Sequence, residues 1–170
     1  MTGLEAQRLA ETLDRTRLRV VFAESCTAGM VAGLLAGVPG ISAYLIGSMV
    51  TYRPEAKIDW LGVSPEVIEQ HTTVSSPVSR SMALAVLAKT PSADLSAAVT
   101  GHLGPNAPAD LDGMIYIAVA RRWRDLPRGD SVEVVMEQQE RLQSTDRIQR
   151  QLETARQVIF TVNRTLSDNV

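Results

Sequence analysis

Residues 18–37 are LRVVFAESCTAGMVAGLLAG, and this stretch sets the architecture of the chain. Its first part, LRVVFA (18–23), is a short apolar run with β-branched side chains and no alternating polarity, which predicts a strand buried on both faces. Small and hydroxyl side chains follow at residues 24–29, where we expect a sharp turn. The apolar residues 30–36 then predict a helix. The order strand, turn and helix N-terminus is typical of an α/β domain.

Strands and helices are interleaved along the rest of the chain. Apolar runs predict strands at residues 44–52, 95–100 and 114–120, and a strand nearer the sheet edge at 132–136. The expected helices are one of about three turns in the first segment, a short one opened by Pro54, two that begin at Ser64-Pro65 and Ser76-Pro77, and an amphipathic one over about 144–166. Some adjacent strands lack a helix between them. The pattern predicts a single three-layer α/β/α domain with a mixed, mostly parallel sheet.

Length and charge limit the class of protein. A chain of 170 residues with 45% hydrophobic content is long enough for one substantial core and short for two, so residues 1–170 are expected to form one domain. The net charge of -2 creates no field that would recruit nucleic acid or an anionic membrane. No signal-peptide core and no run of 18 apolar residues is present, so we expect a cytoplasmic protein.

Metal and cofactor motifs are missing from the sequence. Cys26 is the only cysteine, which excludes an intramolecular disulfide and a cysteine cluster for zinc. No His and carboxylate spacing matches a catalytic zinc site, and no glycine-rich turn matches the dinucleotide or P-loop fingerprint. We therefore expect no metal and no cofactor.

The turn at residues 24–29 is the first candidate site. Unpaired N–H groups at a helix N-terminus can hold a phosphate or stabilise an oxyanion, and Ser25 would lie where such donors converge. The alternative is that Ser25 and Thr27 only cap the following helix. The residues alone favour this alternative, because Ser and Thr caps are common.

A second polar turn, TGHLGP (100–105), follows another predicted core strand. Ligands of parallel sheets bind beyond the carboxyl ends of the strands, so the two turns could face one cleft. Taken alone, a Gly-Pro turn is usually only a turn. His102 in this turn is a better ligand contact than His71, which is expected at a helix end in a structural role.

Lys57 is a candidate base for a serine nucleophile. It lies just beyond an apolar strand, five residues after Tyr52. A partly buried lysine with a lowered pKa can accept the proton of a serine hydroxyl where no histidine is suitably placed. Most lysines are solvated surface charges, so the sequence position by itself leaves both roles open.

Five segments, followed by Asp146-Arg147 in the last helix, occur in the order found in one known family. They are AESCTAG (23–29), VPGISAY (38–44), VTYRPEAKIDWLGV (50–63), VSSPVSRSMA (74–83) and AVTGHLGP (98–105). Together they resemble the nicotinamide-nucleotide amidase family, also known as the C-terminal domain of the competence/damage-inducible protein CinA, over nearly the whole chain.

The resemblance implies hydrolysis of the carboxamide of nicotinamide mononucleotide to nicotinic acid mononucleotide and ammonia, a step in pyridine-nucleotide recycling. It implies that Ser25 is the nucleophile, that Lys57 is its base, and that Tyr52 is a further catalytic residue. It also favours a homo-oligomer, in particular a dimer.

The resemblance also implies a set of substrate-binding residues. Backbone N–H groups of the first turn would hold the oxyanion, the second turn would face the nucleotide, and an arginine of the last helix would pair with the phosphate. The implied residues are Thr27, Ala28, Gly29, Thr100, Gly101, His102, Gly104, Arg147 and Arg150.

Four features depart from the family's usual pattern. Ala28 replaces a glycine, His102 and Leu103 replace Ile-Ala, the loop at 106–112 is shorter, and Arg150 falls one residue early. These departures keep two other functions open, a catalytically inactive module that binds a nucleotide or a protein, and a serine hydrolase of another small amide. Because a binding module needs neither the serine nor the lysine, the retention of both favours the amidase.

Overall fold

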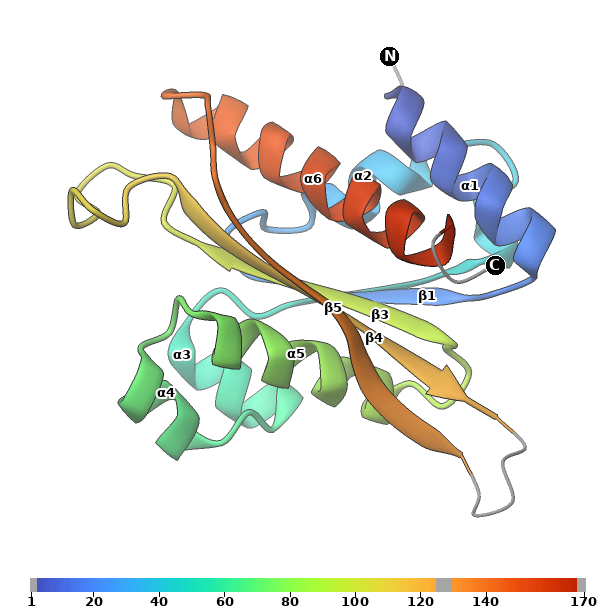
Figure 1. The fold of residues 1–170 in the computed structure, drawn as a ribbon, viewed down its shortest axis with the longest axis horizontal. Coiled ribbons are helices and arrows are strands. Elements are labelled where there is room, and N and C mark those ends of the chain that lie inside the picture. Colours follow the sequence, from blue (N-terminus) through green and yellow to red (C-terminus); the bar gives the residue numbers. More distant parts are fainter. Residues whose placement is uncertain (1–2, 125–129, 168–170) are drawn as a thin grey trace.

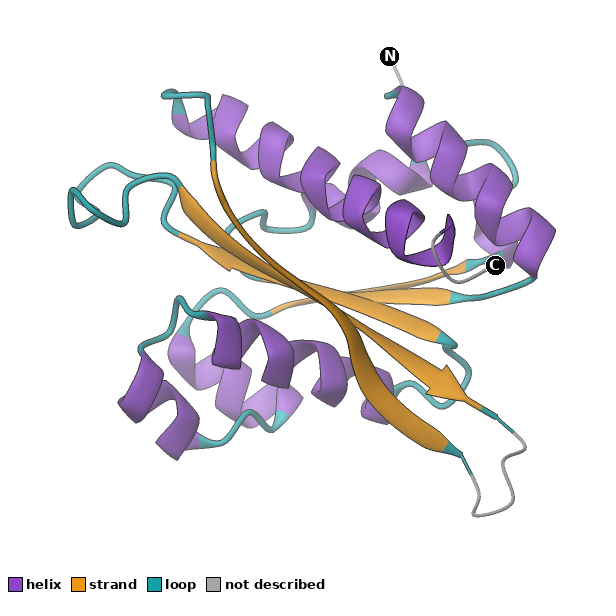
Figure 2. Ribbon diagram, in the orientation of Figure 1, coloured by secondary structure: helices purple, strands orange, loops and turns teal. Residues whose placement is uncertain are grey.

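The computed structural model describes residues 3–124 and 130–167. They form a five-stranded sheet in the order β2-β1-β3-β4-β5, with helices on both faces (Figures 1 and 2). The strands are β1 (Val20–Glu24), β2 (Leu45–Val50), β3 (Leu95–Gly101), β4 (Met114–Trp123) and β5 (Ser131–Arg141). All five lie where apolar runs predict them.

The sheet has a parallel half and an antiparallel half. β1 lies between β2 and β3 and is parallel to both, whereas β4 pairs antiparallel with β3 and with β5. Four of the five described strands therefore run in one direction, which confirms the mixed, mostly parallel sheet. β5 lies at the edge as predicted. It is longer than the expected 132–136, because its polar residues alternate along a strand that is only half covered.

Helices form the two outer layers. On one face lie α1 (Leu4–Thr16), α2 (Met30–Ala36) and α6 (Arg147–Ser167), and on the other lie α3 (Pro54–Ala56), α4 (Pro65–His71) and α5 (Ser76–Lys89) (Figure 1). Two short helical turns complete the list, η1 (Ile41–Ala43) before β2 and η2 (Lys57–Leu61) after α3. The predicted three layers are thus confirmed. No helix of residues 3–124 and 130–167 combines the length and the apolar surface needed to cross a membrane.

Helix starts follow the Ser-Pro pairs closely. α4 begins at Pro65 after Ser64, as predicted. α5 begins at Ser76 with Ser75 as its N-cap, one residue earlier than the Ser76-Pro77 pair predicts. Neither N-cap side chain accepts a hydrogen bond from a backbone N–H of the helix it precedes, although the Ser64 hydroxyl donates to the Glu66 side chain of α4. Proline at the first positions, rather than a serine cap, therefore favours the start of each helix.

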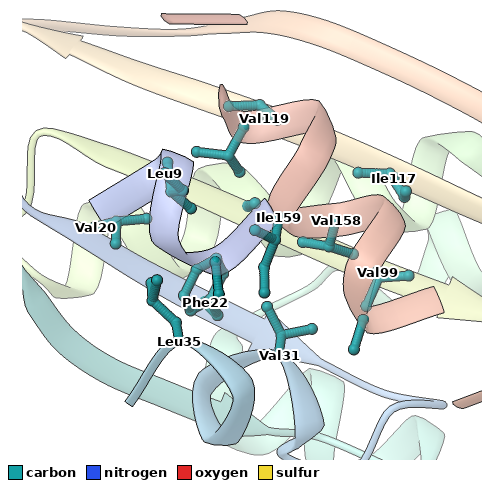
Figure 3. Close-up of a cluster of buried hydrophobic side chains, with 14 of the residues drawn as sticks. Leu9, Val20, Phe22, Val31, Leu35, Val99, Ile117, Val119, Val158 and Ile159 are labelled. Carbon is teal, nitrogen blue, oxygen red and sulfur yellow. The ribbon is translucent and has the colours of Figure 1, made fainter. Parts of the chain in front are cut away.

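Strand β1, the middle strand of the parallel half of the sheet, separates two clusters of buried side chains. Val20 and Phe22 belong to the cluster under α1, α2 and α6, and Val21 and Ala23 belong to the cluster over α5. Alternate side chains of a strand point to opposite faces of the sheet, so an uninterrupted apolar run supplies both clusters at once. In Figure 3 Phe22 lies between the sheet and the helical residues Leu9 and Ile159.

The two phenylalanines of the chain make a matched pair for testing this core. Phe22 is fully buried, whereas Phe160 on α6 is 46% exposed. We expect Phe22→Ala to lower the free energy of unfolding by about 3–5 kcal/mol, because it leaves a cavity in the larger cluster. Phe160→Ala should lower it by less than about 1 kcal/mol. Urea denaturation followed by circular dichroism measures both, and equal losses would contradict the placement of Phe22 at the centre of the core.

Candidate active site

The carboxyl ends of β2, β1 and β3 meet at one end of the sheet, beside the first turn of α6 (Figure 1). Since β1 is the middle strand of this half, Ser25 lies between Tyr52 and the turn that follows β3. A cleft of about 230 Å³ opens there. It is lined by Ser25, Cys26, Tyr52, Thr73, Val74, Gly101, His102, Leu103, Gly104, Pro105, Asn106, Ala107 and Arg147.

Ser25, which lines this cleft, forms a hydrogen-bonded pair with Lys57. The Lys57 side chain is fully buried, and its Nζ lies 2.8 Å from Ser25 Oγ. Among the described residues no carboxylate forms an ion pair with Lys57, and burial lowers the pKa of the amine from 10.5 to about 8. An amine with this pKa is partly neutral near neutral pH, so it can accept a proton from a hydroxyl.

The remaining partners of Lys57 orient its lone pair. Nζ lies 2.7 Å from the carbonyl oxygen of Thr51 and 3.4 Å from that of Tyr52. A neutral amine has two N–H groups and one lone pair, and a carbonyl oxygen can only accept. With both N–H groups directed to the carbonyls, the lone pair is left facing the hydroxyl of Ser25.

A π-helical turn carries Lys57 into the interior. η2 begins at Lys57 and ends before Gly62, which has the left-handed φ of 81°. Lys57 and Leu61, four residues apart, are both buried. The short helix predicted after Pro54 is therefore present, but its last turn is wider than an α-helix. Such turns are rare in proteins, and those that occur are often found at functional sites.

The Glu24 carboxylate holds the turn that carries Ser25. It is fully buried and accepts five hydrogen bonds. Oε2 accepts from Thr27 Oγ1 (2.7 Å), Gly29 N (2.9 Å) and Val31 N (3.0 Å), and Oε1 accepts from Ala32 N (3.1 Å) and Ser48 Oγ (2.9 Å). A carboxylate at a helix N-terminus is favoured by the helix dipole.

Glu24 thereby takes the capping role that the sequence suggested for Ser25 and Thr27. The N-cap residue of α2 is Gly29, which makes no side-chain cap bond, and the Thr27 hydroxyl donates to Glu24. The Ser25 hydroxyl is left for Lys57. Sequence reasoning overlooked Glu24, although a charged residue directly after a buried strand was a signal that could have identified it.

The backbone N–H groups of the turn are unevenly committed. The Ala28 N–H donates to Ser25 O at 3.1 Å, and the Gly29 N–H donates to Glu24. No hydrogen bond between described residues uses the N–H of Cys26 or of Thr27. Of the three N–H groups expected to hold an oxyanion, at Thr27, Ala28 and Gly29, only that of Thr27 makes no hydrogen bond with a described residue. The N–H of its neighbour Cys26 is also without one. Ala28 itself has a left-handed φ of 52°, a conformation in which the family's usual glycine would meet less steric cost.

Several predicted binding residues lie beside the cleft without lining it. Thr27 and Thr100 are fully buried, and the Thr100 hydroxyl donates to Thr73 O at 3.2 Å, so Thr100 supports a wall of the cleft. Gly101, by contrast, lines the cleft, and a Cβ on it would lie 2.7 Å from Ile115 Cγ2 and 3.2 Å from Cys26 Sγ, so this position needs glycine for packing. The cleft also includes residues that the sequence did not single out for binding, namely Cys26, Thr73, Val74, Leu103, Pro105, Asn106 and Ala107.

The two candidate arginines of α6 have different surroundings. Arg150 is largely buried and bonds both oxygens of Asp112 at 2.8 Å, which neutralises its charge. Arg147 lines the cleft and donates to Tyr52 Oη at 2.6 Å and to the carbonyl oxygen of Gly104. It has no ion pair with a described residue, so it carries the uncompensated charge of the cleft. The Tyr52 hydroxyl bonds this arginine, whereas Lys57 meets the Tyr52 carbonyl.

The lining contains His102 and Arg147 and no described aspartate or glutamate, although the chain has a net charge of -2. Burial raises the pKa of the Cys26 thiol to about 12, so this sulfur stays protonated beside Ser25. Across the described residues no group of three or more His, Cys, Asp or Glu side chains could hold a metal ion. The site therefore offers a hydroxyl, a buried amine and a cationic rim.

Comparison with known proteins identifies the family of this arrangement. The family model of the CinA C-terminal domain matches residues 4–165. A CinA-like protein of Mycobacterium marinum is 47% identical over 87 residues, which are 51% of this chain and 20% of that protein. A CinA-like protein of Chloroherpeton thalassium is 40% identical over 116 residues, which are 67% of this chain and 27% of that protein. The chain thus spans about a quarter of the length of these curated relatives.

Solved structures share the fold along the whole chain. A CinA superfamily protein from Klebsiella pneumoniae has a TM-score of 0.85 and 26% identity, covering 99% of both chains. The competence/damage-inducible protein CihA from Agrobacterium tumefaciens has a TM-score of 0.81 and 30% identity, covering 97% of this chain and 98% of that one.

The carboxylate of Glu24 can be tested by one isosteric change. Glu24→Gln replaces an acceptor oxygen with an amide group that cannot accept, and it removes the charge at the N-terminus of α2. We expect the free energy of unfolding to fall by about 3 kcal/mol. The control Glu69→Gln changes an exposed carboxylate on α4 and should have an effect below about 0.5 kcal/mol. Equal urea midpoints for the two variants would contradict the organising role of Glu24.

Proposed function

The chain belongs to the CinA C-terminal domain family, and from this premise we propose that it is an amidohydrolase that converts nicotinamide mononucleotide to nicotinic acid mononucleotide and ammonia. Ser25 is the nucleophile and Lys57 is its base. The observation that carries the proposal is the 2.8 Å hydrogen bond between Ser25 Oγ and a fully buried Lys57 that lacks a described carboxylate partner. A binding module needs no such pair.

The reaction follows the acyl-enzyme logic of serine hydrolases. Lys57 accepts the proton of Ser25 as Oγ attacks the carboxamide carbon. The same proton then passes to the leaving nitrogen, the C–N bond breaks, and ammonia departs from a serine ester. A water molecule attacks the ester and gives a proton to Lys57. Lys57 passes this proton to Ser25 Oγ as the ester bond breaks, which restores both residues and releases the acid product, which ionises to the carboxylate.

The negative oxygen that forms in both steps needs hydrogen-bond donors. The N–H groups of Cys26 and Thr27 suit this role, because no hydrogen bond between described residues uses them and because Glu24 holds the turn rigid. Cys26 also lines the cleft. Donors fixed before the reaction cost no reorganisation when the charge develops, which is why a rigid turn favours catalysis.

The charge of the cleft supports an anionic substrate. Arg147 holds two neutral acceptors, the Tyr52 hydroxyl and the Gly104 carbonyl. A phosphate group would be a stronger partner for a guanidinium than either of them. Tyr52 then serves to position Arg147 rather than to transfer a proton.

Ammonia release distinguishes this function from the two alternatives. Purified protein incubated with nicotinamide mononucleotide should release ammonia in equimolar amount with nicotinic acid mononucleotide. A module without activity would bind the nucleotide and release none, and a hydrolase of another small amide would act on that amide in preference to the nucleotide.

Ser25→Ala should reduce this turnover by at least about a thousandfold, since it removes the nucleophile. Product binding should be retained, because only one hydroxyl is lost from the turn. Cys26→Ala is the matched control, and we expect it to keep most of the activity because its thiol stays protonated. Initial rates and calorimetric binding of nicotinic acid mononucleotide measure both effects. Near-normal turnover by Ser25→Ala, with loss in Cys26→Ala, would assign the nucleophile to the thiol.

The lowered pKa of Lys57 predicts the pH dependence. The base is active when neutral, and its pKa is about 8, so kcat/KM should rise tenfold per pH unit below pH 8 and level off above it. Lys57→Arg keeps a positive charge but has no accessible neutral form, so we expect it to be inactive across this range. A profile that is flat from pH 6 to pH 9, or an active Lys57→Arg variant, would contradict the base role.

A further inference from the structure

His102 lies at a fixed position in the wall of the cleft. Its N–H donates to Met114 O at 2.9 Å, and its carbonyl accepts from the Gly113 N–H at 2.8 Å, so two hydrogen bonds anchor its backbone to the start of β4. Its side chain is half-buried and lines the cleft together with Ser25. The ring is thus presented to a ligand by a backbone that cannot easily shift.

The imidazole of His102 has uncommitted nitrogens. No hydrogen bond between residues of the described ranges uses its ring, and the carboxylate of Asp112, in the same β3–β4 connection, is bonded by both terminal nitrogens of Arg150. A half-buried imidazole has at least one N–H to donate in every protonation state. The partner for that donor must come from the solvent or from a ligand.

Arg147 approaches the same turn. Its guanidinium bonds the carbonyl of Gly104, two residues after His102, and the Cα atoms of two such residues are about 7 Å apart at most. A ligand group that contacts Arg147 near Gly104 is therefore within reach of the His102 ring. The described lining has no carboxylate to compete for either donor.

We propose that His102 is a specificity-determining residue, whose ring donates a hydrogen bond to the phosphate of the substrate beside Arg147. The site then selects a phosphate monoester over the uncharged nucleoside. The kinetic test of this inference rests on the proposed function, because it measures amide hydrolysis. The contact with the phosphate does not depend on that reaction. A hydroxyl of the ribose is the competing partner. The phosphate is favoured because the residues that line the cleft include the cation Arg147 and no described aspartate or glutamate.

Substrate preference tests the inference in the intact protein. The measured quantity is the ratio of kcat/KM for nicotinamide mononucleotide to kcat/KM for nicotinamide riboside, which lacks only the phosphate. We expect His102→Leu to lower this ratio at least tenfold, chiefly through the KM of the nucleotide, because one charge-assisted hydrogen bond is lost. His102→Gln keeps an N–H donor and should recover part of the ratio. His71→Gln, which changes the exposed histidine at the end of α4, should leave it unchanged.

Binding of ribose 5-phosphate tests the same contact without the amide. Titration calorimetry should show weaker binding to His102→Leu than to the unsubstituted protein, with binding to His71→Gln unchanged. If no ammonia is released from the nucleotide but this loss of binding is seen, the proposed function fails and the inference stands.

Three results would overturn the inference while leaving the amidase intact. One is equal binding of ribose 5-phosphate by His102→Leu and the unsubstituted protein. Another is an equal fall in kcat/KM for nucleotide and riboside, which would assign the ring to the ribose or the nicotinamide. The third is no binding of ribose 5-phosphate by the unsubstituted protein, which would exclude a phosphate contact at this wall.

Discussion

The buried carboxylate of Glu24 is the interaction on which the site depends. It takes donors from the Ser25 turn, from the first residues of α2 and from Ser48 on β2, so one group joins β1, the edge strand β2 and a helix. A buried charge is tolerated only when its hydrogen-bonding capacity is filled. With five donors present, the carboxylate fixes the turn and leaves the Ser25 hydroxyl uncommitted to capping.

The same commitment keeps the two buried charged groups of this region apart. Glu24 and Lys57 are both fully buried, yet the pKa of Lys57 is lowered by burial and gains nothing from a carboxylate. A carboxylate bonded directly to Nζ would favour the charged amine and raise that pKa. The oxygens of Glu24 accept from N–H and O–H donors, and among the described residues the amine bonds the carbonyls of Thr51 and Tyr52 and the hydroxyl of Ser25. The lowered pKa of Lys57 in the Ser25–Lys57 pair is consistent with Glu24 holding the turn and not bonding the amine.

Sequence patterns predicted the strands more fully than the site. The apolar run before Glu24 supplies both core clusters, so its burial on two faces is readable from composition alone. The pairing of Ser25 with Lys57 was implied by family resemblance, and no spacing rule gives a contact across 32 residues. Competition for hydrogen bonds inside a turn is also invisible in a sequence. The resemblance places Thr100 at the nucleotide, and the structure adds that its hydroxyl donates to the carbonyl of Thr73, a contact across 27 residues that no local pattern gives.

In the proposed function, catalysis and substrate selection come from different parts of this fold. The proposed nucleophile, Ser25, follows β1 and the proposed base, Lys57, follows β2, where Glu24 and the π-helical turn hold them. The opposite wall is the β3–β4 connection, which arginines of β5 and α6 secure: Arg141 donates to the carbonyls of Asp110 and Asp112, and Arg150 bonds the Asp112 carboxylate. Most departures from the family pattern fall in or against this wall. Because hydrogen bonds anchor this wall, residues in it such as His102 can be substituted without disturbing Ser25. Substrate specificity can therefore differ between members of the family that retain the Ser25–Lys57 pair.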